Sequence, residues 1–197
     1  MSKRVDFYFD VGSPASYLAW TQLPTLCRTA GAELVCKPML LGGVFQRTGN
    51  ASPMTVPAKA RYVNHDLQRY ARRYDVPLAV NPHFPIITLF LMRVVTGIAA
   101  QEPDRLHALL DTVFKAIWVD ALDLNKPELT AQVLSDAGFD PQRMLAFAGS
   151  PEIKEALKAA TQEAIDRGVF GAPTFFVGDE MFFGQDRLEM VRDELTR

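Results

Sequence analysis

Apolar and polar residues alternate from Val5 to Phe9, a run rich in aromatic side chains. A period of two predicts a short buried β-strand, because successive side chains of a strand point to opposite sides. The run stops at the turn residues Asp10 to Gly12. Ser13 then precedes Pro14, an order typical of the first residues of a helix. Ser13 is therefore predicted to cap a helix whose free amide groups and positive dipole end favour a bound anion, including a thiolate.

The pattern then changes to helical spacing and back to a strand. A helix is predicted from Pro14 to about Ala30, with Gly31 as its C-cap. Pro24 lies inside this helix, where a proline removes a backbone hydrogen bond, so it is expected to kink the helix or break it. The next strand is predicted from Glu33 to Met39. A strand, a helix and a second strand favour a right-handed crossover in which the two strands are parallel.

Residues 40–56 contain several glycines and prolines and are predicted to form a loop. From 57 to 165 the apolar residues recur at helical spacing. The clearest stripe comprises Leu106, Leu109, Leu110, Val113, Phe114 and Ile117. The predicted caps of this block are Asn125, in a capping box with Glu128, and Asp140 and Ser150, each before a proline. We expect 57–165 to be a helical domain inserted between the two halves, 1–56 and 166–197, of a second domain.

Another strand pattern lies near the C-terminus. A glycine-containing loop ends at Pro173, which leads directly into an apolar strand. A proline cannot donate to a sheet, so this position indicates a specialised bend, for which a cis peptide bond is one solution. The pair Gly178-Asp179 predicts a tight turn between two strands, with glycine first as a type II′ turn requires. A final helix is predicted from Asp186, with Glu189 completing a capping box.

Length and charge narrow the class of protein. The chain has 197 residues, of which 48% are hydrophobic, which is enough for a sizeable core. A formal net charge of −2 gives no electrostatic basis for binding nucleic acid or an anionic membrane. No apolar run approaches the roughly 20 residues of a membrane-spanning helix. Asp6 and Asp10 interrupt the stretch behind the N-terminal Met-Ser-Lys-Arg, which argues against a secretory signal, so we expect a cytoplasmic protein.

Cysteine and histidine positions give little sign of metal or redox chemistry. The two cysteines, Cys27 and Cys36, do not form a C-x-x-C pair and are predicted to be inert packing residues. His65 and His107 are expected on the surface, and His83 lies in a loop that could border a pocket. The sequence contains no H-E-x-x-H motif, no Cys/His cluster and no P-loop motif. Metal catalysis and nucleotide hydrolysis therefore have no support, and no metal site is expected.

The predicted order of elements is that of a thioredoxin fold, and several motifs point to one group within it. The matching segments are FYFDVGSPASY at 7–17, GN at 49–50, P-x-K-x-x-Y-x-x-x-D-L at 57–67, FGAP at 170–173 and FGQDR at 183–187. The chain resembles the family that holds the kappa-class glutathione transferases and the 2-hydroxychromene-2-carboxylate isomerases, relatives of the oxidoreductase DsbA. The resemblance implies an α/β protein, a thioredoxin fold with a large all-helical insertion, that forms homodimers and uses glutathione.

The resemblance also assigns roles to residues that have simpler explanations. Ser13 stands where a disulfide oxidoreductase carries its nucleophilic cysteine, so any sulfur chemistry must come from a ligand. By sequence alone Ser13 and Asp186 are helix caps. The resemblance implies that Ser13 stabilises the glutathione thiolate as the catalytic residue, while Asp186, helped by Gln185, holds the γ-glutamyl end.

Four further positions carry over as glutathione-binding residues. Pro173 alone is a strand-initiating proline, but the resemblance implies a cis bond that exposes the Ala172 backbone to pair with the cysteinyl part of glutathione. Asn50 alone is a turn residue, and the resemblance makes it a ligand-contacting amide. Pro57 and Lys59 carry over from the 57–67 run, although a lysine at a helix start is usually only solvated.

Phe45, Arg47 and Phe84 are the residues that we expect to contact the substrate. Together these features favour a glutathione-dependent cis/trans isomerase of the 2-hydroxychromene-2-carboxylate isomerase type, in which the thiolate adds reversibly to a conjugated aromatic small-molecule substrate. The alternatives are a kappa-class transferase or peroxidase, and a non-catalytic thioredoxin-like binding module.

Overall fold

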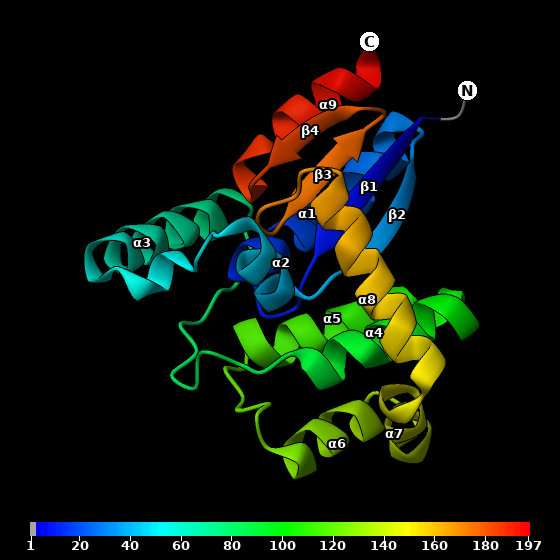
Figure 1. The fold of residues 1–197 in the computed structure, drawn as a ribbon. Helices are drawn as coiled ribbons and strands as arrows, with labels where there is room; N and C mark the ends of the chain where they lie inside the picture. The colour runs from blue at the N-terminus through cyan, green and yellow to red at the C-terminus, as the bar shows by residue number, and fades with distance from the viewer. Residues whose placement is uncertain (1–2) are drawn as a thin grey trace.

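The structure is a computed structural model and describes residues 3–197. Its four-stranded sheet has the order β2-β1-β3-β4 (Figure 1). Strand β1 (Arg4–Phe9) pairs in parallel with β2 (Glu33–Pro38) and antiparallel with β3 (Thr174–Val177), which pairs antiparallel with β4 (Glu180–Phe183). The predicted α/β class, the parallel first pair and the C-terminal hairpin are confirmed.

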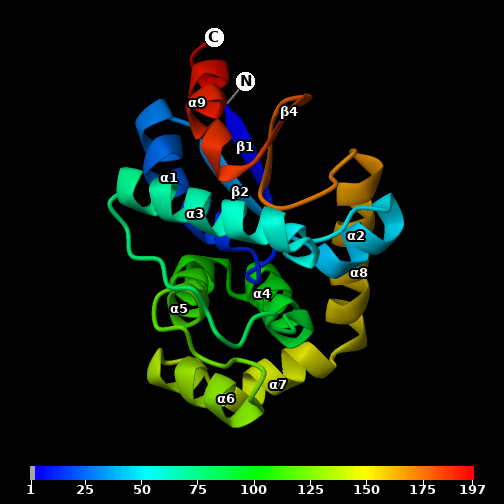
Figure 2. The ribbon, with the colours of Figure 1, turned by 90° about the vertical axis from the view of Figure 1, so that its left-hand side faces the viewer.

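Helices make up most of the rest of the described chain. They are α1 (Pro14–Ala30), α2 (Leu41–Thr48), α3 (Pro57–Arg73), α4 (Leu89–Gln101), α5 (Leu106–Trp118), α6 (Pro127–Asp136), α7 (Pro141–Gly149), α8 (Pro151–Asp166) and α9 (Leu188–Thr196). Three short 3₁₀ turns, η1 (Pro53–Thr55), η2 (Pro103–Arg105) and η3 (Gln185–Arg187), precede α3, α5 and α9. Both ends of the described chain lie at the same end of the molecule (Figures 1 and 2).

Strand β1 separates two hydrophobic clusters. Val5, Phe7 and Phe9 are fully buried on one face, where they pack with side chains from α1, α4, α5 and α9. Tyr8 points to the other face and packs with Phe176 and with residues of α2 and α8. Both faces of β1 are therefore buried, because helices cover the sheet on each side.

Helices α4 to α7 gather beyond one end of the sheet, while α3 crosses between this group and the sheet (Figure 2). Helix α8 returns toward the sheet and contacts β2 (Figure 1). The larger hydrophobic cluster is continuous from β1 into α4 and α5. The division into a domain of residues 1–56 and 166–197 and an inserted domain of residues 57–165 stays a prediction.

One backbone prediction was wrong. Residues 40–56 are not only loop, since α2 forms within them despite Gly42 and Gly43. Val44 is fully buried, and the first amide of the helix, that of Leu41, donates to the distant Asp10 carboxylate at 2.9 Å. Pro24, which was predicted to kink α1 or break it, does not break the helix, whose 17 residues run from Pro14 to Ala30.

Two of the predicted helix caps are confirmed, and the two predicted capping boxes are not. Asp140 and Ser150 accept hydrogen bonds from the amides of Gln142 and Ile153, as predicted. The two capping boxes were wrong, because α6 and α9 begin after Lys126 and Arg187, which make no side-chain cap bond. The side chain of Asn125 instead accepts a hydrogen bond from the Ile87 amide and donates to the carbonyl oxygens of His83 and Pro85. The carboxylate of Asp186 accepts from the Arg187 guanidinium.

Candidate active site

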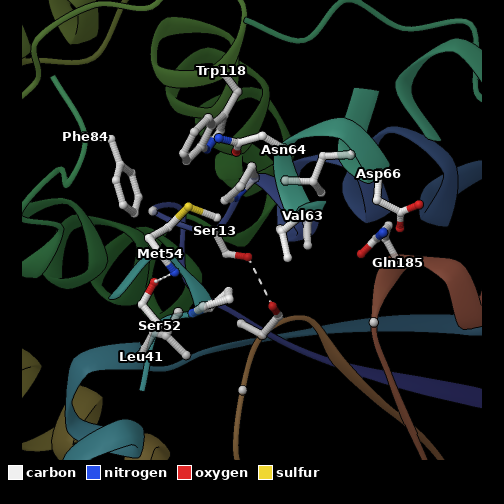
Figure 3. A pocket seen from close by; sticks show the side chains of 18 of the residues that line it. Ser13, Leu41, Ser52, Met54, Val63, Asn64, Asp66, Phe84, Trp118 and Gln185 are labelled. Carbon is white, nitrogen blue, oxygen red and sulfur yellow. Dashed lines mark hydrogen bonds between the residues drawn. The ribbon is translucent and has the colours of Figure 1, made fainter. Parts of the chain in front are cut away.

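A cavity of about 590 Å³ opens where several distant segments meet. Its wall combines the turn between β1 and α1, the segment from the start of α2 to η1, one side of α3, the segment 78–84 with Trp118, and the loops at both ends of the β3–β4 hairpin. Figure 3 shows Ser13 between the side chains of these segments. The cavity therefore depends on the packing of segments that are far apart in the sequence, although residues 12–15 of its lining are consecutive.

Ser13 is the polar residue at the head of α1. Its backbone is extended (φ −96°, ψ 116°), and its Oγ accepts a hydrogen bond from the Ser16 amide at 3.1 Å, so the predicted cap is confirmed. The same hydroxyl donates to the carbonyl oxygen of Ala172 at 3.1 Å (Figure 3). Ser13 is 5% exposed and lines the cavity. A hydroxyl is thus held at the N-terminus of a 17-residue helix, whose positive dipole end favours negative charge.

Asp10 supports this turn from behind. Its carboxylate accepts hydrogen bonds from the amide of Gly12 and the amide of Leu41, both at 2.9 Å, and from the Thr88 hydroxyl at 3.1 Å. Three segments are therefore tied to one buried side chain. Burial raises the pKa of Asp10, against the opposing effect of these three hydrogen bonds. The carboxylate is 2% exposed and does not line the cavity.

The loop before β3 forms the wall beside Ser13. The Ala172-Pro173 peptide bond is cis, as the sequence indicated, and so is Phe84-Pro85, for which the sequence gave no sign. A Cβ at Gly171 would lie 2.7 Å from the Phe183 ring, which packs on Phe170 with centroids 4.6 Å apart. The close approach of this loop to the end of β4 therefore depends on glycine.

The segment after β4 forms one end of the cavity. Gly184 has φ +103°, and a Cβ at this position would collide with the Asp186 carboxylate. Tyr74 donates from its hydroxyl to the Gln185 carbonyl at 2.6 Å, which fixes the segment to the end of α3. Burial raises the pKa of Tyr74 to about 12, so this donor keeps its proton at any physiological pH. Asp186 pairs with Arg187 at 2.6 Å.

Most of the residues predicted for the site line this cavity. They are Ser13, Phe45, Asn50, Phe84, Ala172, Gln185 and Asp186. The amide of Asn50 donates to the Phe170 carbonyl at 2.8 Å, which links the segment after α2 to the loop before β3. Four predicted residues are not brought into the lining: Arg47, Pro57, Lys59 and Pro173. Arg47 lies in the last turn of α2 and Lys59 in the first turns of α3, both exposed.

Several lining residues were not found from the sequence. Met54, Asn64, Val80 and Trp118 reach the cavity only because η1, α3, the 78–84 segment and the end of α5 fold over the β1–α1 turn. Asp66 also lines it, and it is the aspartate of the P-x-K-x-x-Y-x-x-x-D-L run, so its signal was available.

The remaining titratable groups lie away from the cavity. His65 and His107 are exposed, as predicted, and His83 faces Asp123 with Nδ1 and Oδ2 3.7 Å apart. Burial raises the pKa of the free thiols of Cys27 and Cys36 to about 11 and about 12. In residues 3–197 there is no group of three or more His, Cys, Asp or Glu side chains placed to hold a metal ion.

Comparison with known proteins assigns the family. A family model described as a DSBA-like thioredoxin domain matches residues 4–196. The chain belongs to this family. A 2-hydroxychromene-2-carboxylate isomerase from Sphingobium xenophagum is 32% identical over 99% of this chain and 99% of its own length. Glutathione s-transferase kappa 2 from Caenorhabditis elegans is 30% identical, covering 98% of this chain and 92% of the relative.

The solved structures agree with this assignment. A 2-hydroxychromene-2-carboxylate isomerase structure has a TM-score of 0.87 and 32% identity, covering 98% of this chain and 95% of that one. The thioredoxin fold of the DsbA type and the resemblance to the isomerase and kappa transferase group are both confirmed. The protein is an enzyme of this group. No helix within residues 3–197 combines the length and hydrophobicity needed to span a bilayer.

Proposed function

We propose that this enzyme is a glutathione-dependent cis/trans isomerase of the 2-hydroxychromene-2-carboxylate isomerase type. The observation that carries the proposal is the position of Ser13, whose hydroxyl lines the cavity at the N-terminus of α1. Relatives with this name, 32% and 35% identical over nearly the whole chain, support the choice of reaction.

The residues around the cavity suit glutathione chemically. Its ammonium group requires an acidic partner and its carboxylates require donors. Asp66, Asp186 and Arg187 offer these groups at one end of the cavity. The Ala172 backbone, next to Ser13, can pair with the cysteinyl part of a tripeptide as an added strand would. Asn50 lies on the same wall and can contact the ligand through its amide.

Ser13 would act by keeping a ligand sulfur ionised. A free thiol has a pKa near 8.5 and is mostly protonated at neutral pH. The Ser13 hydroxyl can rotate from the Ala172 carbonyl and donate to the sulfur, while the first amides of α1 supply positive potential. Both effects favour the thiolate and lower the thiol pKa. Glutathione, when bound, supplies a thiolate that adds reversibly to a conjugated double bond and so allows that bond to change geometry without net consumption of glutathione.

A kappa-type glutathione transferase or peroxidase is the second candidate. The similarity to kappa-class relatives and the P-x-K-x-x-Y-x-x-x-D-L run at 57–67 favour it. The same Ser13 would serve this reaction, and the difference lies in whether the product leaves with glutathione attached.

The first experiment tests thiol activation. Glutathione is titrated into the protein by calorimetry, and the ultraviolet difference band of the thiolate is followed against pH. We expect binding with a lowered thiol pKa, and loss of most of that shift in Ser13→Ala. Ser16→Ala is the matched control, because the Ser16 hydroxyl is buried in the same helical turn and makes no hydrogen bond within residues 3–197. Absence of binding, or equal shifts in both variants, would reject the proposal.

The second experiment separates the two reactions. The enzyme is incubated with glutathione and either 2-hydroxychromene-2-carboxylate or 1-chloro-2,4-dinitrobenzene, and the concentration of free glutathione is measured over time. Isomerisation with a constant glutathione concentration supports the first proposal. Stoichiometric loss of glutathione with both compounds would favour the transferase.

A further inference from the structure

Two buried side chains join the Ser13 turn to the segment that carries Phe84. The Asp10 carboxylate accepts a hydrogen bond from the Gly12 amide at 2.9 Å and, through its second oxygen, one from the Thr88 hydroxyl at 3.1 Å. Thr88 follows Phe84 in the same segment and directly precedes α4. Ser13 and Phe84 both line the cavity (Figure 3), whereas Asp10 and Thr88 do not. The bond between Asp10 and Thr88 therefore connects two parts of the cavity wall from behind.

The turn and Thr88 also pack closely against each other. A Cβ at Gly12 would lie 2.9 Å from the Thr88 methyl carbon and 3.4 Å from an Asp10 carboxylate oxygen, so this approach depends on glycine. The Ser13 amide donates to the Asp10 carbonyl at 3.0 Å, which closes the turn. Asp10 and Thr88 are 2% and 8% exposed, so water hardly competes for the bond between their side chains. Movement of either segment would break a buried hydrogen bond.

We propose that Asp10 and Thr88 are positioning residues, which hold the Ser13 hydroxyl in a fixed place relative to a substrate that lies against Phe84. The inference rests on the proposed function and deepens it, since neither side chain reaches the ligand. A thiolate adds to a double bond only when the reacting atoms approach to about 3–3.5 Å in the right orientation. Ser13 places the sulfur and the Phe84 segment places the substrate. The bond between Asp10 and Thr88 therefore sets how closely the two reactants meet.

The hydrogen bond and the packing of Thr88 can be tested separately. Thr88→Val keeps the methyl group that packs on Gly12 and loses the hydroxyl, whereas Thr88→Ser keeps the hydroxyl and loses the methyl group. Thr96→Val is the matched control, because Thr96 is also buried and its hydroxyl donates to the Met92 carbonyl within α4 at 2.7 Å. Urea unfolding of the three variants gives the stability that each one loses.

The readouts are the pKa of the bound glutathione thiol and the separate values of kcat and KM, measured with the compound that the wild type converts. We expect Thr88→Val to raise the thiol pKa by about 0.5–1 and to lower kcat about three- to tenfold with KM little changed. Thr88→Ser and Thr96→Val should match the wild type in both. A wild-type thiol pKa and kcat in Thr88→Val, or equal losses in Thr96→Val, would overturn the inference.

The direction of the change in thiol pKa separates position from charge. The Thr88 hydroxyl favours the ionised form of the Asp10 carboxyl, so its loss raises the pKa of Asp10 further. A less negative carboxyl beside the turn would lower the pKa of the bound thiol. A displaced Ser13 hydroxyl raises it, so the expected rise reports the position of Ser13.

A thiol introduced by Ser13→Cys makes the test independent of glutathione. The pKa values of Cys27 and Cys36, about 11 and about 12, keep these thiols protonated where the introduced thiol titrates. Combination of Ser13→Cys with Thr88→Val should raise the pKa of the introduced thiol, and with Thr96→Val should not. A protein that shows this rise but leaves bound glutathione protonated supports the inference and rejects the isomerase. A protein that ionises glutathione equally well with and without the Thr88 hydroxyl rejects the inference alone.

Discussion

The Ser13 hydroxyl donates to the Ala172 carbonyl at 3.1 Å and joins two parts of the chain that are 159 residues apart. The same oxygen accepts from the Ser16 amide, so one small side chain both caps α1 and fixes the loop before β3. A hydroxyl has a single proton to give. Donation to a bound sulfur must therefore replace donation to Ala172.

Replacement of Ser13 separates the cap from the donor. Ser13→Ala should lower the free energy of unfolding by about 0.5–2 kcal/mol, because the cap bond is lost. Ser13→Asp keeps an acceptor for the Ser16 amide but has no proton to donate when ionised, so it should keep most of the stability and still fail to lower the thiol pKa. Urea unfolding and thiolate absorbance measure the two effects. Full thiol ionisation in Ser13→Asp would contradict the donor role.

Asp10 should give the protein a recognisable dependence of stability on pH. Burial raises its pKa in the folded state above the ordinary value of 3.8, so the folded protein holds this proton more strongly than the unfolded chain does. The contribution of Asp10 is then fully present below pH 3.8 and is lost as pH rises through the folded pKa. Asp10→Asn provides the reference that does not titrate. The free energy of unfolding of the wild type minus that of the variant should fall with rising pH, and a rise would contradict the assignment.

The cysteines should be inert in the native protein. Because burial raises the pKa of Cys27 to about 11 and that of Cys36 to about 12, both thiols stay protonated at pH 8. An aromatic disulfide reagent should react slowly with the folded chain and with two thiols per chain in denaturant. Fast reaction of either thiol in the folded state would contradict the prediction that both cysteines are inert.

Gly184 should be required at the charged end of the cavity. Gly184→Ala places a side chain at φ +103° and against the Asp186 carboxylate, so both stability and glutathione affinity should fall. Gly178→Ala is the matched control, since φ is +59° there but the space around it is open. Both variants should lose about 1–2 kcal/mol of stability from the left-handed backbone. A loss of glutathione affinity is expected for Gly184→Ala alone, as calorimetry would show.

Local signals predicted the parts of the site that depend on neighbours in the sequence. Ser13 was found because a strand, a turn and Ser-Pro follow one another within ten residues, and Pro173 because it heads a strand. Trp118 and Val80 gave no such signal, since their place in the cavity depends on how α5 and the 78–84 segment pack. Helix α2 was missed because its first amide is satisfied by Asp10, 31 residues earlier in the chain.

The position of Arg47 outside the cavity lining also follows from α2. A loop at 40–56 would have allowed this residue to reach the cavity, whereas α2 holds it in an exposed last turn.

The two ends of the described chain lie together at one end of the molecule, at the end of the sheet away from the β1–α1 turn (Figures 1 and 2). A circular permutant that joins them by a short linker, with new ends opened in the exposed hairpin turn at Gly178, should therefore keep the cavity beside Ser13. By the same geometry, attachment of the enzyme to a solid support through either end of the described chain should keep Ser13 and the start of α1 away from the support.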